Sequence, residues 1–548
     1  MSILVIGVIG LILLSVGTGQ PLYVLIGAVA SFLLLASGQV DGFESLKIII
    51  ETTRELSEKE VLLAIPFFVI SGAIMSEGDI ARRLIAVARA CFGWLSGGLA
   101  VSTVVACIFF AAISGSSPVT VIAIGSIMYP AMVAEKFSER FSTGLVSTAG
   151  SLGILIPPSI PMIVYAIVVP GGFVDPPGYN LAGENGSLGL VELFIAGLGP
   201  GLLIGGLLAA YSIVEGRRAR ASKSPLAMSE VLSTTRRGFW ALMLPVLILG
   251  GIYSGIFTPT QAAAASVFYA LIVELYVHRS LTVHDLPRVL SQATVLIGAL
   301  LIIVALAQGF NKYLTLAQVA EAAVVFLDQY ELTPITFLIL VNILLLIVGC
   351  FMDILSAILI LVPLISPIAL QLGIHPMHLA VIFIVNLEIG YLTPPLGLNL
   401  FVASTIFKKS LGEVIRSVLP FLGLMVVGLT LVTYVPTISL GAVSLKNGEG
   451  LYVPFPERRI AMDNIEIPEE IRFLSAVAGD DGVPVVEEEV VDPGRPLTIQ
   501  EMMAQAEADR EEEAMDNLAY DSLSELLLDY RRVRSGELLL EELNSGDE

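Results

Sequence analysis

Long apolar runs separated by short polar stretches make up most of the first 440 residues. A helix needs about 20 consecutive apolar residues to cross a bilayer, and several runs are near this length while others are clearly shorter. The short runs predict hairpins that enter the membrane and return. The runs include residues 3–17, 22–36, 61–75, 98–113, 118–134, 193–214, 239–252, 262–277, 289–309, 335–352, 354–370 and 414–435. The pattern predicts an all-α polytopic membrane protein. Its first run is expected to be an uncleaved span, because it has no basic flank and no clear cleavage site.

Adjacent prolines interrupt two of the apolar regions. The first is GILIPPSIPMIVYA at residues 153–166, and the second is GYLTPPLGLNLFVA at residues 390–403. Proline lacks an N–H group and its ring clashes with the preceding helical turn, so neither region is predicted to be a continuous helix. Irregular backbone at membrane depth is tolerated where it is buried in protein or lines a cavity. For either segment alone, a simple proline kink is the alternative.

The two interruptions have the same place in an internal repeat. Both Pro-Pro pairs follow a glycine by the same number of residues. The displacement along the chain from Pro157 to Pro394, which we call the repeat shift, equals that from Pro130 to Pro367 in the preceding apolar runs. We interpret the chain as two repeats, over about residues 61–170 and 298–406, each with a hairpin followed by a broken helix.

Loop charges predict the orientation of these repeats. Lysine and arginine concentrate on the cytoplasmic side of membrane proteins. Residues 215–237 hold six basic residues and residues 171–192 hold none, so the first loop is predicted inside and the second outside. Counting crossings gives the two broken helices opposite directions, which is the inverted-repeat architecture of many secondary transporters. The same count places the C-terminus outside. The other basic residues predicted inside are Arg82, Arg83, Arg89, Lys136, Arg279, Arg288, Lys408 and Lys409.

A turn of small polar residues precedes the first break. In AAISGSSPVTVIAIGS, residues 111–126, the sequence Gly115-Ser116-Ser117-Pro118 separates two short apolar arms. Such a turn offers carbonyl and hydroxyl oxygens to a hard cation and N–H groups at a positive helix end to an anion. Close packing of helices by small residues is the alternative interpretation.

The corresponding turn of the second repeat contains a carboxylate. It is GCFMDILS, residues 349–356, in which Asp353 aligns with Ser116. Ionisable residues in apolar membrane segments are functional hypotheses by default, and Glu388 is a second one. Asp353 is expected either to cap a helix at the hairpin tip or to belong to an ion or substrate site, and Glu388 to orient the broken segment. Further polar side chains near the second break are Asn386, Thr393 and Asn399.

Several other function classes are disfavoured. No G-x-x-x-x-G-K-[ST] loop is present, so ATP is not expected to drive the protein directly. The three cysteines are widely spaced, and the four histidines form no H-E-x-x-H motif, which argues against disulfides and a zinc site. GSLG at residues 150–153 would suit an intramembrane serine hydrolase, but no histidine lies in the apolar runs to activate Ser151. A channel fits inverted broken repeats less well than alternating access does.

The last part of the chain differs in composition. The formal net charge is −21, and residues 444–548 contribute −18 of it, from 27 acidic and 9 basic residues. We divide the chain into a transmembrane transporter domain, residues 1–440, and an acidic soluble extension, residues 441–548. The extension is predicted to be solvated and partly disordered, although amphipathic patterns such as LSELLLDY also allow helices that dock on a partner.

Six segments together resemble a known family, the large membrane subunit (DctM-type) of tripartite ATP-independent periplasmic (TRAP) transporters. The resemblance covers about residues 1–440 in order, and its motifs are long. The segments are LAIPFFVISGAIM (63–75), SGSSPVTVIAIGSIMYPAM (114–132), GILIPPSIPMIVYAI (153–167), FTPTQAAAASVFYAL (257–271), GCFMDILSAILILVPLISPIA (349–369) and NLEIGYLTPPLGLNLFVAS (386–404).

The resemblance implies an elevator-type carrier in a bacterial inner membrane. It implies Na⁺ as the coupling ion, a small four-helix membrane subunit (DctQ-type) and a periplasmic solute-binding protein (DctP-type). We expect the small subunit on a separate chain. The implied activity is import of a carboxylate, such as a C4-dicarboxylate or a sugar acid, without an organic cofactor and without enzymatic chemistry. The alternative is a stand-alone anion/Na⁺ symporter of related fold that needs no binding protein.

The resemblance also implies which regions bind ions and substrate. The sodium sites map to two groups: Ser114, Gly115, Ser116, Ser117, Gly150 and Gly153, and Gly349, Met352, Asp353, Asn386, Gly390 and Thr393. The residues nearest the substrate would be Ser117, Pro118, Thr393, Pro395 and Asn399. The chain departs from the family pattern at Val119, where alanine is usual, in the long loop 171–192, and in the acidic tail. The substrate itself cannot be named from these residues.

Overall fold

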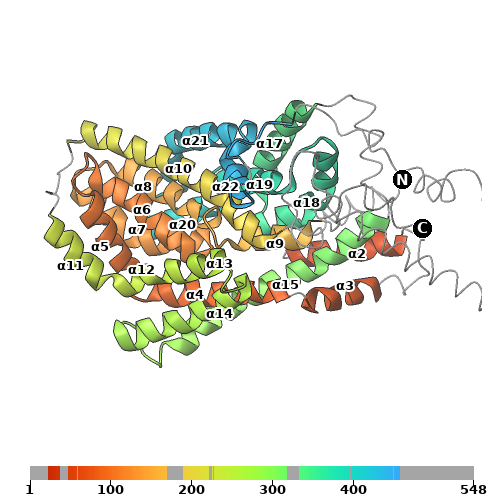
Figure 1. Cartoon of the computed structure of the whole chain (residues 1–548), viewed down its shortest axis with the longest axis horizontal. Helices are drawn as coiled ribbons and strands as arrows, with labels where there is room; N and C mark the ends of the chain where they lie inside the picture. The colour runs from red at the N-terminus through yellow and green to blue at the C-terminus, as the bar shows by residue number, and fades with distance from the viewer. Residues whose placement is uncertain are drawn as a thin grey trace, which may run out of the picture. The chain divides into compact units, whose positions relative to one another are not determined.

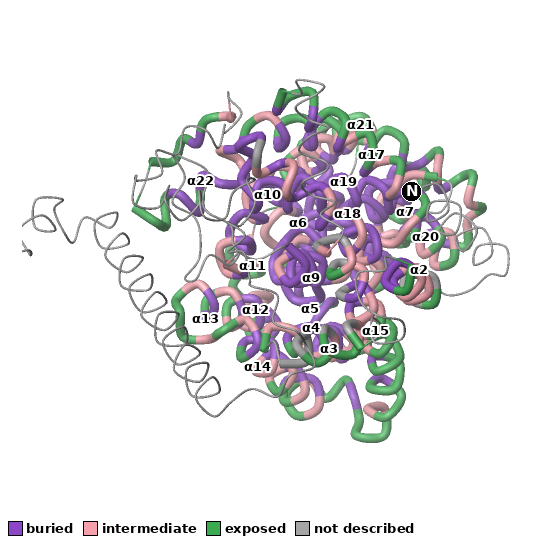
Figure 2. Tube along the Cα trace, turned by 90° about the vertical axis from the view of Figure 1, so that its right-hand side faces the viewer, coloured by how far each residue is buried: buried purple, intermediate pink, exposed green. Residues whose placement is uncertain are grey.

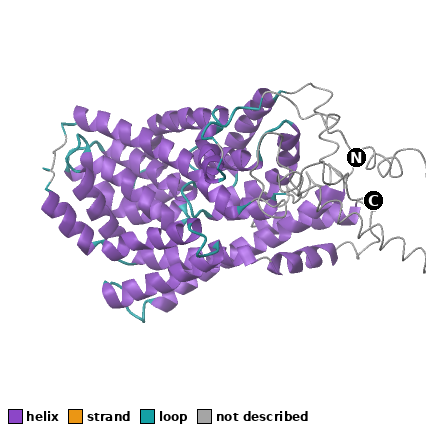
Figure 3. Cartoon of the chain, in the orientation of Figure 1, coloured by secondary structure: helices purple, strands orange, loops and turns teal. Residues whose placement is uncertain are grey.

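The computed structural model describes residues 22–36, 47–58, 60–169, 189–220, 225, 227–316, 333–394, 397–448 and 450–456. These residues form helices joined by turns, and no strand occurs among them (Figure 3). The apolar run 3–17 and the acidic extension from residue 457 onward lie outside the described residues. By length and composition, seven helical spans of the described part can cross a membrane. They are Glu60–Glu77, Ser117–Ala134, Leu190–Arg218, Pro259–Val277, Leu286–Ala307, Pro334–Phe351 and Leu411–Tyr434. The prediction of an all-α polytopic membrane protein is confirmed.

The helix boundaries confirm the internal repeat. Helix α7 (Ser117–Ala134) and helix α18 (Ile354–Gln371) begin and end at positions related by the repeat shift, and each contains its proline, Pro130 or Pro367. The other corresponding pairs agree to within two residues at each end. They are α6 (Gly98–Ser114) with α17 (Pro334–Phe351), α8 (Glu139–Ser151) with α19 (Pro376–Gly390), and α9 (Ile160–Val168) with α20 (Leu398–Phe407).

Both predicted breaks are present. After α8 the chain makes one 3₁₀ turn at Leu152–Ile154 and then runs without regular structure to Ser159, whose hydroxyl caps α9 by accepting from the N–H of Met162. Between α19 and α20 the helix is interrupted after Gly390 and resumes at Leu398. The first break is buried along its whole length, so it lies inside the protein and does not face lipid.

The helices fall into two packing groups (Figure 1). In one group, α4 and α15 pack on each other, α14 packs on α4, and α2 and α3 pack on α15. In the other, α10, α21 and α22 pack around the repeat helices. Figure 2 shows buried positions concentrated around α6, α9, α18 and α19. The bounds of the first group are α2 (Leu22–Ala36), α3 (Lys47–Glu58), α4 (Ala64–Glu77), α14 (Pro259–Ile272) and α15 (Leu286–Leu316). The remaining helices are α5 (Ile80–Phe92), α10 (Leu190–Arg218), α11 (Met228–Arg237), α12 (Phe239–Pro245), α13 (Gly251–Tyr253), α21 (Leu411–Tyr434) and α22 (Thr437–Lys446).

The two repeats exchange contacts in a symmetric way. Helix α7 of the first repeat packs on α20 of the second, and α18 of the second packs on α9 of the first. These two contacts correspond to each other under the repeat shift. Packing of this kind is expected when two repeats are related by a pseudo-two-fold axis. The opposite orientation of the repeats across a membrane stays a prediction.

Polar contacts agree with the predicted sidedness of the loops. Arg83 donates to the carbonyl oxygen of Arg237 at 2.7 Å, and both belong to segments predicted on the inner face. Lys446 pairs with Glu192 at 2.6 Å, so the end of α22 and the start of α10 lie on one face, as the crossing count requires. Which face is the outer one stays a prediction, as does the boundary at residue 440, which α22 runs through.

Candidate functional site

The tip of the first hairpin is a compact polar turn. Helix α6 ends at Ser114, and Gly115 follows in the left-handed region with φ 57°, a conformation that favours glycine. The hydroxyls of Ser114 and Thr120 lie 2.9 Å apart, and Thr120 also donates to the carbonyl oxygen of Ser116 at 2.8 Å. Several oxygen atoms therefore gather within one turn of backbone.

This tip lies directly against the first break. A Cβ built on Gly153 would stand 2.6 Å from the carbonyl oxygen of Ser116, and one on Gly115 would stand 2.9 Å from the carbonyl oxygen of Pro158. A Cβ on Gly150 would stand 2.4 Å from Val121 Cγ2 in α7. The structure thus brings together the residues of the predicted first sodium group. The hairpin tip and the break can lie this close because glycine has no side chain.

The tip of the second hairpin is arranged differently, because Asp353 caps α18. Its carboxylate accepts from the backbone N–H of Ser356 at 3.1 Å and from the Ser356 hydroxyl. This geometry supports the helix-cap alternative. The corresponding residue of the first repeat, Ser116, is also the N-terminal cap residue of its helix, yet its side chain makes no capping hydrogen bond.

Glycines also join the second tip to the second break. A Cβ on Gly390 would stand 2.6 Å from the backbone of Gly349, so α17 and α19 touch at these two residues. Next to them, the hydroxyl of Tyr391 accepts from the N–H of Ile354 at 3.3 Å, beside the predicted residues Met352 and Asp353.

The side-chain hydrogen bonds of two predicted residues of the second group run to α17 and α19 and not to the tip residues 353–356. Asn386 donates to Asn342 Oδ1 in α17 at 2.7 Å and to the carbonyl oxygen of Ile382 at 2.8 Å. The Thr393 hydroxyl donates back to the carbonyl oxygen of Ile389 at 2.8 Å. Their role as sodium ligands stays a prediction.

One polar contact joins the two repeats at the predicted substrate region. Asn399, in the first turn of α20, donates from Nδ2 to the Ser117 hydroxyl in the first turn of α7 at 2.5 Å. Both side chains are fully buried, and Asn399 Oδ1 has no hydrogen-bond partner. The positions related to this pair by the repeat shift are Ile354 and Met162, which are apolar. The two pairs occupy corresponding positions of the repeats, and one pair is polar whereas the other is apolar.

Helix capping shows the same asymmetry. The N-termini of α7 and α20 carry no side-chain cap, whereas Asp353 caps α18 and Ser159 caps α9. Capping side chains take up the free N–H groups of the first helical turn. Pro118 has no N–H group, and the N–H groups of Asn399 and Leu400 in α20 already donate to the carbonyl oxygens of Tyr391 and Gly397, at 3.2 and 2.8 Å. What the adjacent ends of α7 and α20 offer an anion is therefore mainly their positive dipole ends, together with the N–H groups that remain in the first turn of α7. Of the other predicted substrate residues, Pro118 is half-buried beside Ser117, and Pro395 lies outside the described residues.

Buried acceptor atoms without partners occur in α19 and α20, the helices that flank the second break. They are Asn386 Oδ1, Glu388 Oε2 and Asn399 Oδ1. Buried polar atoms are normally hydrogen-bonded, so each such atom needs a ligand or another explanation. Oxygen atoms of this kind, with carbonyls of unwound helix, are the donors that broken transporter helices offer to Na⁺. Among the described residues, His, Cys, Asp and Glu form no group of three or more that could hold a metal ion.

Sequence reasoning misses some contacts and misjudges one histidine. Thr120 is not among the residues predicted at the first tip, although it stands one helical turn after Ser116. The statement that no histidine lies in an apolar span is wrong for His378, which is buried in the first turn of α19. Its ring binds the Ser439 hydroxyl at 2.7 Å and the Thr433 carbonyl oxygen at 3.1 Å, so it does not activate Ser151.

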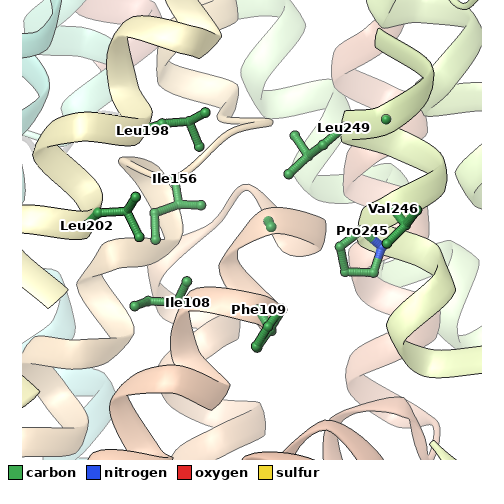
Figure 4. A pocket seen from close by; sticks show the side chains of 10 residues that line it. Ile108, Phe109, Ile156, Leu198, Leu202, Pro245, Val246 and Leu249 are labelled. Atoms are coloured by element: carbon green, nitrogen blue, oxygen red, sulfur yellow. The ribbon is translucent and has the colours of Figure 1, made fainter. Parts of the chain in front are cut away.

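An apolar cavity of about 390 Å³ borders the first break (Figure 4). Its walls include Phe109 and Ala112 from α6, Ile156 from the break, Leu202 from α10 and Val246 from the segment after α12. That segment, Val246–Gly250, is π-helical and follows Pro245. The cavity thus separates the repeat helices from α12, and nothing in its lining suits a charged solute.

Comparison with known proteins gives a consistent result. The family model described as "Tripartite ATP-independent periplasmic transporter, DctM component" matches residues 5–438. The chain is 46% identical over 387 residues to the C4-dicarboxylate TRAP transporter large permease protein DctM of Pseudomonas aeruginosa, covering 70% of this chain and 87% of that one. It is 40% identical over 441 residues to the protein of the same name from Rhodobacter capsulatus, covering 80% and 98%.

A solved structure is similar in fold. The crystal structure of the YdaH transporter of Alcanivorax borkumensis aligns with a TM-score of 0.52 at 14% identity, over 79% of this chain and 99% of that chain. At this identity the likeness concerns the fold alone.

Proposed function

We propose that this chain, which belongs to the DctM component family of tripartite ATP-independent periplasmic transporters, carries a C4-dicarboxylate or a similar organic acid into the cell together with Na⁺. As a multi-pass member of a transporter family, it is a carrier and not an enzyme. The relatives described above are named for C4-dicarboxylates, which supports this substrate class first.

One observation carries the substrate proposal. The uncapped N-termini of α7 and α20 are joined by the buried contact between Ser117 and Asn399, whereas the corresponding ends of α18 and α9 are capped by their own side chains. A carboxylate at the uncapped ends would accept from N–H groups that no side chain takes up. The Ser117 hydroxyl and the Asn399 amide would add polar contacts to it.

Charge explains why Na⁺ would travel with the acid. An anion is costly at the centre of a membrane unless opposite charge lies close to it. Cations bound where the glycine contacts press each hairpin tip against its break would offset the field of the carboxylates. If more positive than negative charge enters in each cycle, the membrane potential assists by about 2.3 kcal/mol per net charge per 100 mV.

The proposed movement is an elevator. The repeat helices with α10, α21 and α22 would move as one body against α2, α3, α4, α14 and α15. The packing within each group, such as α14 on α4 and α2 on α15, is more extensive than the contacts of α15 with α18 and of α4 with α6 and α7 that join the groups, which supports this division. Helix α5 would serve as one connecting arm, since it follows α4 directly and packs on α6. Helix α12 and the segment Val246–Gly250 pack on α14 and are assigned to the second body, so the apolar cavity between this segment and α6 lies where the two bodies would slide.

We also propose two partners, a small membrane subunit on a separate chain and a periplasmic binding protein that delivers the acid. The family supports both. The inner membrane is the proposed location, with the acidic tail in the periplasm.

Reconstitution tests the proposal. The chain is placed in liposomes with a DctQ-type small subunit, the binding protein is added outside, and uptake of radiolabelled succinate, malate and fumarate is measured with an inward gradient of Na⁺ or of K⁺. We expect saturable uptake of at least one acid that needs Na⁺ and both partners. Uptake by this chain alone would support the stand-alone symporter. Non-saturating flux without Na⁺ dependence would support a channel.

A further inference from the structure

A hydrogen-bonded pair of side chains joins the two broken helices just before their breaks. The Ser151 hydroxyl oxygen lies 2.7 Å from Glu388 Oε1 and also 2.7 Å from the carbonyl oxygen of Thr148, so its one hydrogen is shared between two acceptors, and both Ser151 and Glu388 are fully buried. The two residues are 237 apart, which equals the repeat shift, so they occupy corresponding positions of the two repeats. When corresponding residues of two symmetry-related copies contact each other, they must lie on the symmetry axis. The pair therefore marks the pseudo-two-fold axis of the molecule.

Its position relative to the breaks is the same on both sides. Ser151 is the last residue of α8 and precedes Pro157 by six residues, and Glu388 precedes Pro394 by six residues. Just beyond the pair, Gly153 presses on the first hairpin tip. A shift of either helix at this point would move its break relative to the tip that the break contacts.

The chemistry of the pair is unusual for a purely packed core. No ion pair in the described part of the chain includes Glu388, and its Oε2 atom has no hydrogen-bond partner. Burying a carboxyl group that makes so few hydrogen bonds is costly, and an apolar side chain of similar size would avoid that cost. Packing alone therefore does not explain why residue 388 is a glutamate. Its contact with Ser151 does.

We propose that Ser151 and Glu388 form a positioning link that holds the two breaks in register, so that the ion-binding geometry of each half depends on the other. The link rests on the proposed Na⁺ coupling. Neither residue needs to touch the ion or the acid. Two identical residues at these corresponding positions could not form the same link. Two serines would be too short to meet, and two glutamates would repel each other.

Substitutions at the pair separate the link from other roles. Ser151→Ala removes the hydroxyl that contacts Glu388 Oε1, and we expect the Na⁺ concentration for half-maximal uptake to rise about fivefold. Glu388→Gln keeps an oxygen that can accept from Ser151. The Na⁺ concentration for half-maximal uptake by this variant should therefore stay within about twofold of that of the unmodified protein. Glu388→Ala should resemble Ser151→Ala, and the double variant Ser151→Ala/Glu388→Ala should be no worse than the worse single variant, because one contact is lost in each case.

Ser147→Ala is the matched control. Ser147 is a buried serine one turn earlier in α8, and its hydroxyl donates within the helix to the carbonyl oxygen of Thr143 at 2.8 Å. Its loss should leave the Na⁺ response unchanged. The folded fraction of every variant is measured by size-exclusion chromatography, and uptake is expressed per folded transporter. A role in stability alone would lower the folded fraction without moving the Na⁺ concentration for half-maximal uptake.

Distinct results overturn the proposal. If Glu388→Gln loses the Na⁺ response as Glu388→Ala does, the charge of Glu388 matters and the link is wrong. If the effects of Ser151→Ala and Glu388→Ala add, the two residues act independently. Ser151→Cys, which keeps a weak donor, replaces Ser151→Ala if that variant does not fold. If the unmodified protein shows no Na⁺ dependence, the proposed function fails, and the same double-variant comparison is then made on the KM for succinate.

Discussion

Replacing Gly153 with alanine would add a single methyl group where the first break meets the first hairpin tip. The new Cβ would lie 2.6 Å from the carbonyl oxygen of Ser116 and 2.7 Å from the hydroxyl oxygen of Thr120. Ordinary contacts of this kind begin near 3.4 Å, so the methyl group is too close by about 0.8 Å. One of the opposing atoms belongs to the backbone and cannot rotate away.

The tip and the break must therefore separate for Gly153→Ala to fit. Inserting a methyl group into a well-packed site costs about 1–3 kcal/mol. If ion binding requires the close arrangement, this cost appears in the binding equilibrium, where each 1.4 kcal/mol is about a tenfold change. We expect the Na⁺ concentration for half-maximal uptake to rise by about 5- to 150-fold.

The assay is Na⁺-driven succinate uptake in proteoliposomes, with the amount of folded protein measured in parallel. Gly423→Ala in α21 is the matched control, because no atom outside its own helix lies within 4 Å of the Cβ position. Alanine favours a helix interior more than glycine does, so Gly423→Ala should be neutral or stabilising. A Gly153→Ala protein with the original Na⁺ response would refute the idea that the tip and the first break together form an ion site.

Three further outcomes follow from the structure. Ser117→Ala and Asn399→Ala should each raise the KM for succinate about tenfold by removing a polar contact to the proposed carboxylate, as measured by initial uptake rates. Glu192→Cys and Lys446→Cys, combined in a background without native cysteines, should cross-link on oxidation, and in each single variant an impermeant maleimide should label the free cysteine from outside the cell. Ala112→Trp should fill the apolar cavity beside α12 and slow uptake severalfold, while Na⁺ binding by the detergent-solubilised protein is kept.

Each outcome has its control. Thr405→Ala, which removes an exposed hydroxyl of α20 that bonds within its own helix, should leave the KM for succinate unchanged. Lys409→Cys, predicted inside, should resist the impermeant maleimide, and labelling at 409 but not at 446 would show the topology to be reversed. Val427→Trp on the exposed surface of α21 should not slow uptake. Full transport by Ala112→Trp would contradict sliding at the cavity.

The breaks and the repeat could be predicted because proline acts locally. The missing N–H group and the ring of Pro157 or Pro394 disturb the helix that contains them, whatever surrounds it. The first hairpin tip could be predicted in the same way, since the left-handed conformation of Gly115 is a property of one residue. The choice between a cap and an ion site at Asp353 could not be made, because both uses place a carboxylate before a helix.

The cross-repeat contacts could not be predicted, since they join residues far apart in sequence. Ser117 and Asn399 are 282 residues apart, and only the packing of α7 on α20 brings them together. The error on His378 has a different cause. Pro376 suggests a loop when the sequence is considered alone, but proline is favoured in the first turn of a helix, so α19 starts at Pro376 and includes His378.

The molecule combines a symmetric backbone with unsymmetric side chains, and this explains how one site can serve an anion while the fold has two halves. Ser116 corresponds to Asp353, yet only Asp353 caps its helix. The polar pair Ser117 and Asn399 corresponds to an apolar pair. We therefore propose that the carboxylate binds at the ends of α7 and α20 and not at those of α18 and α9, where side chains cap the helices and the Asp353 charge would repel it. Since glycines bring both tips close to their breaks, the proposed cation sites have a place in each half, whereas the acid is proposed to bind at one pair of helix ends only.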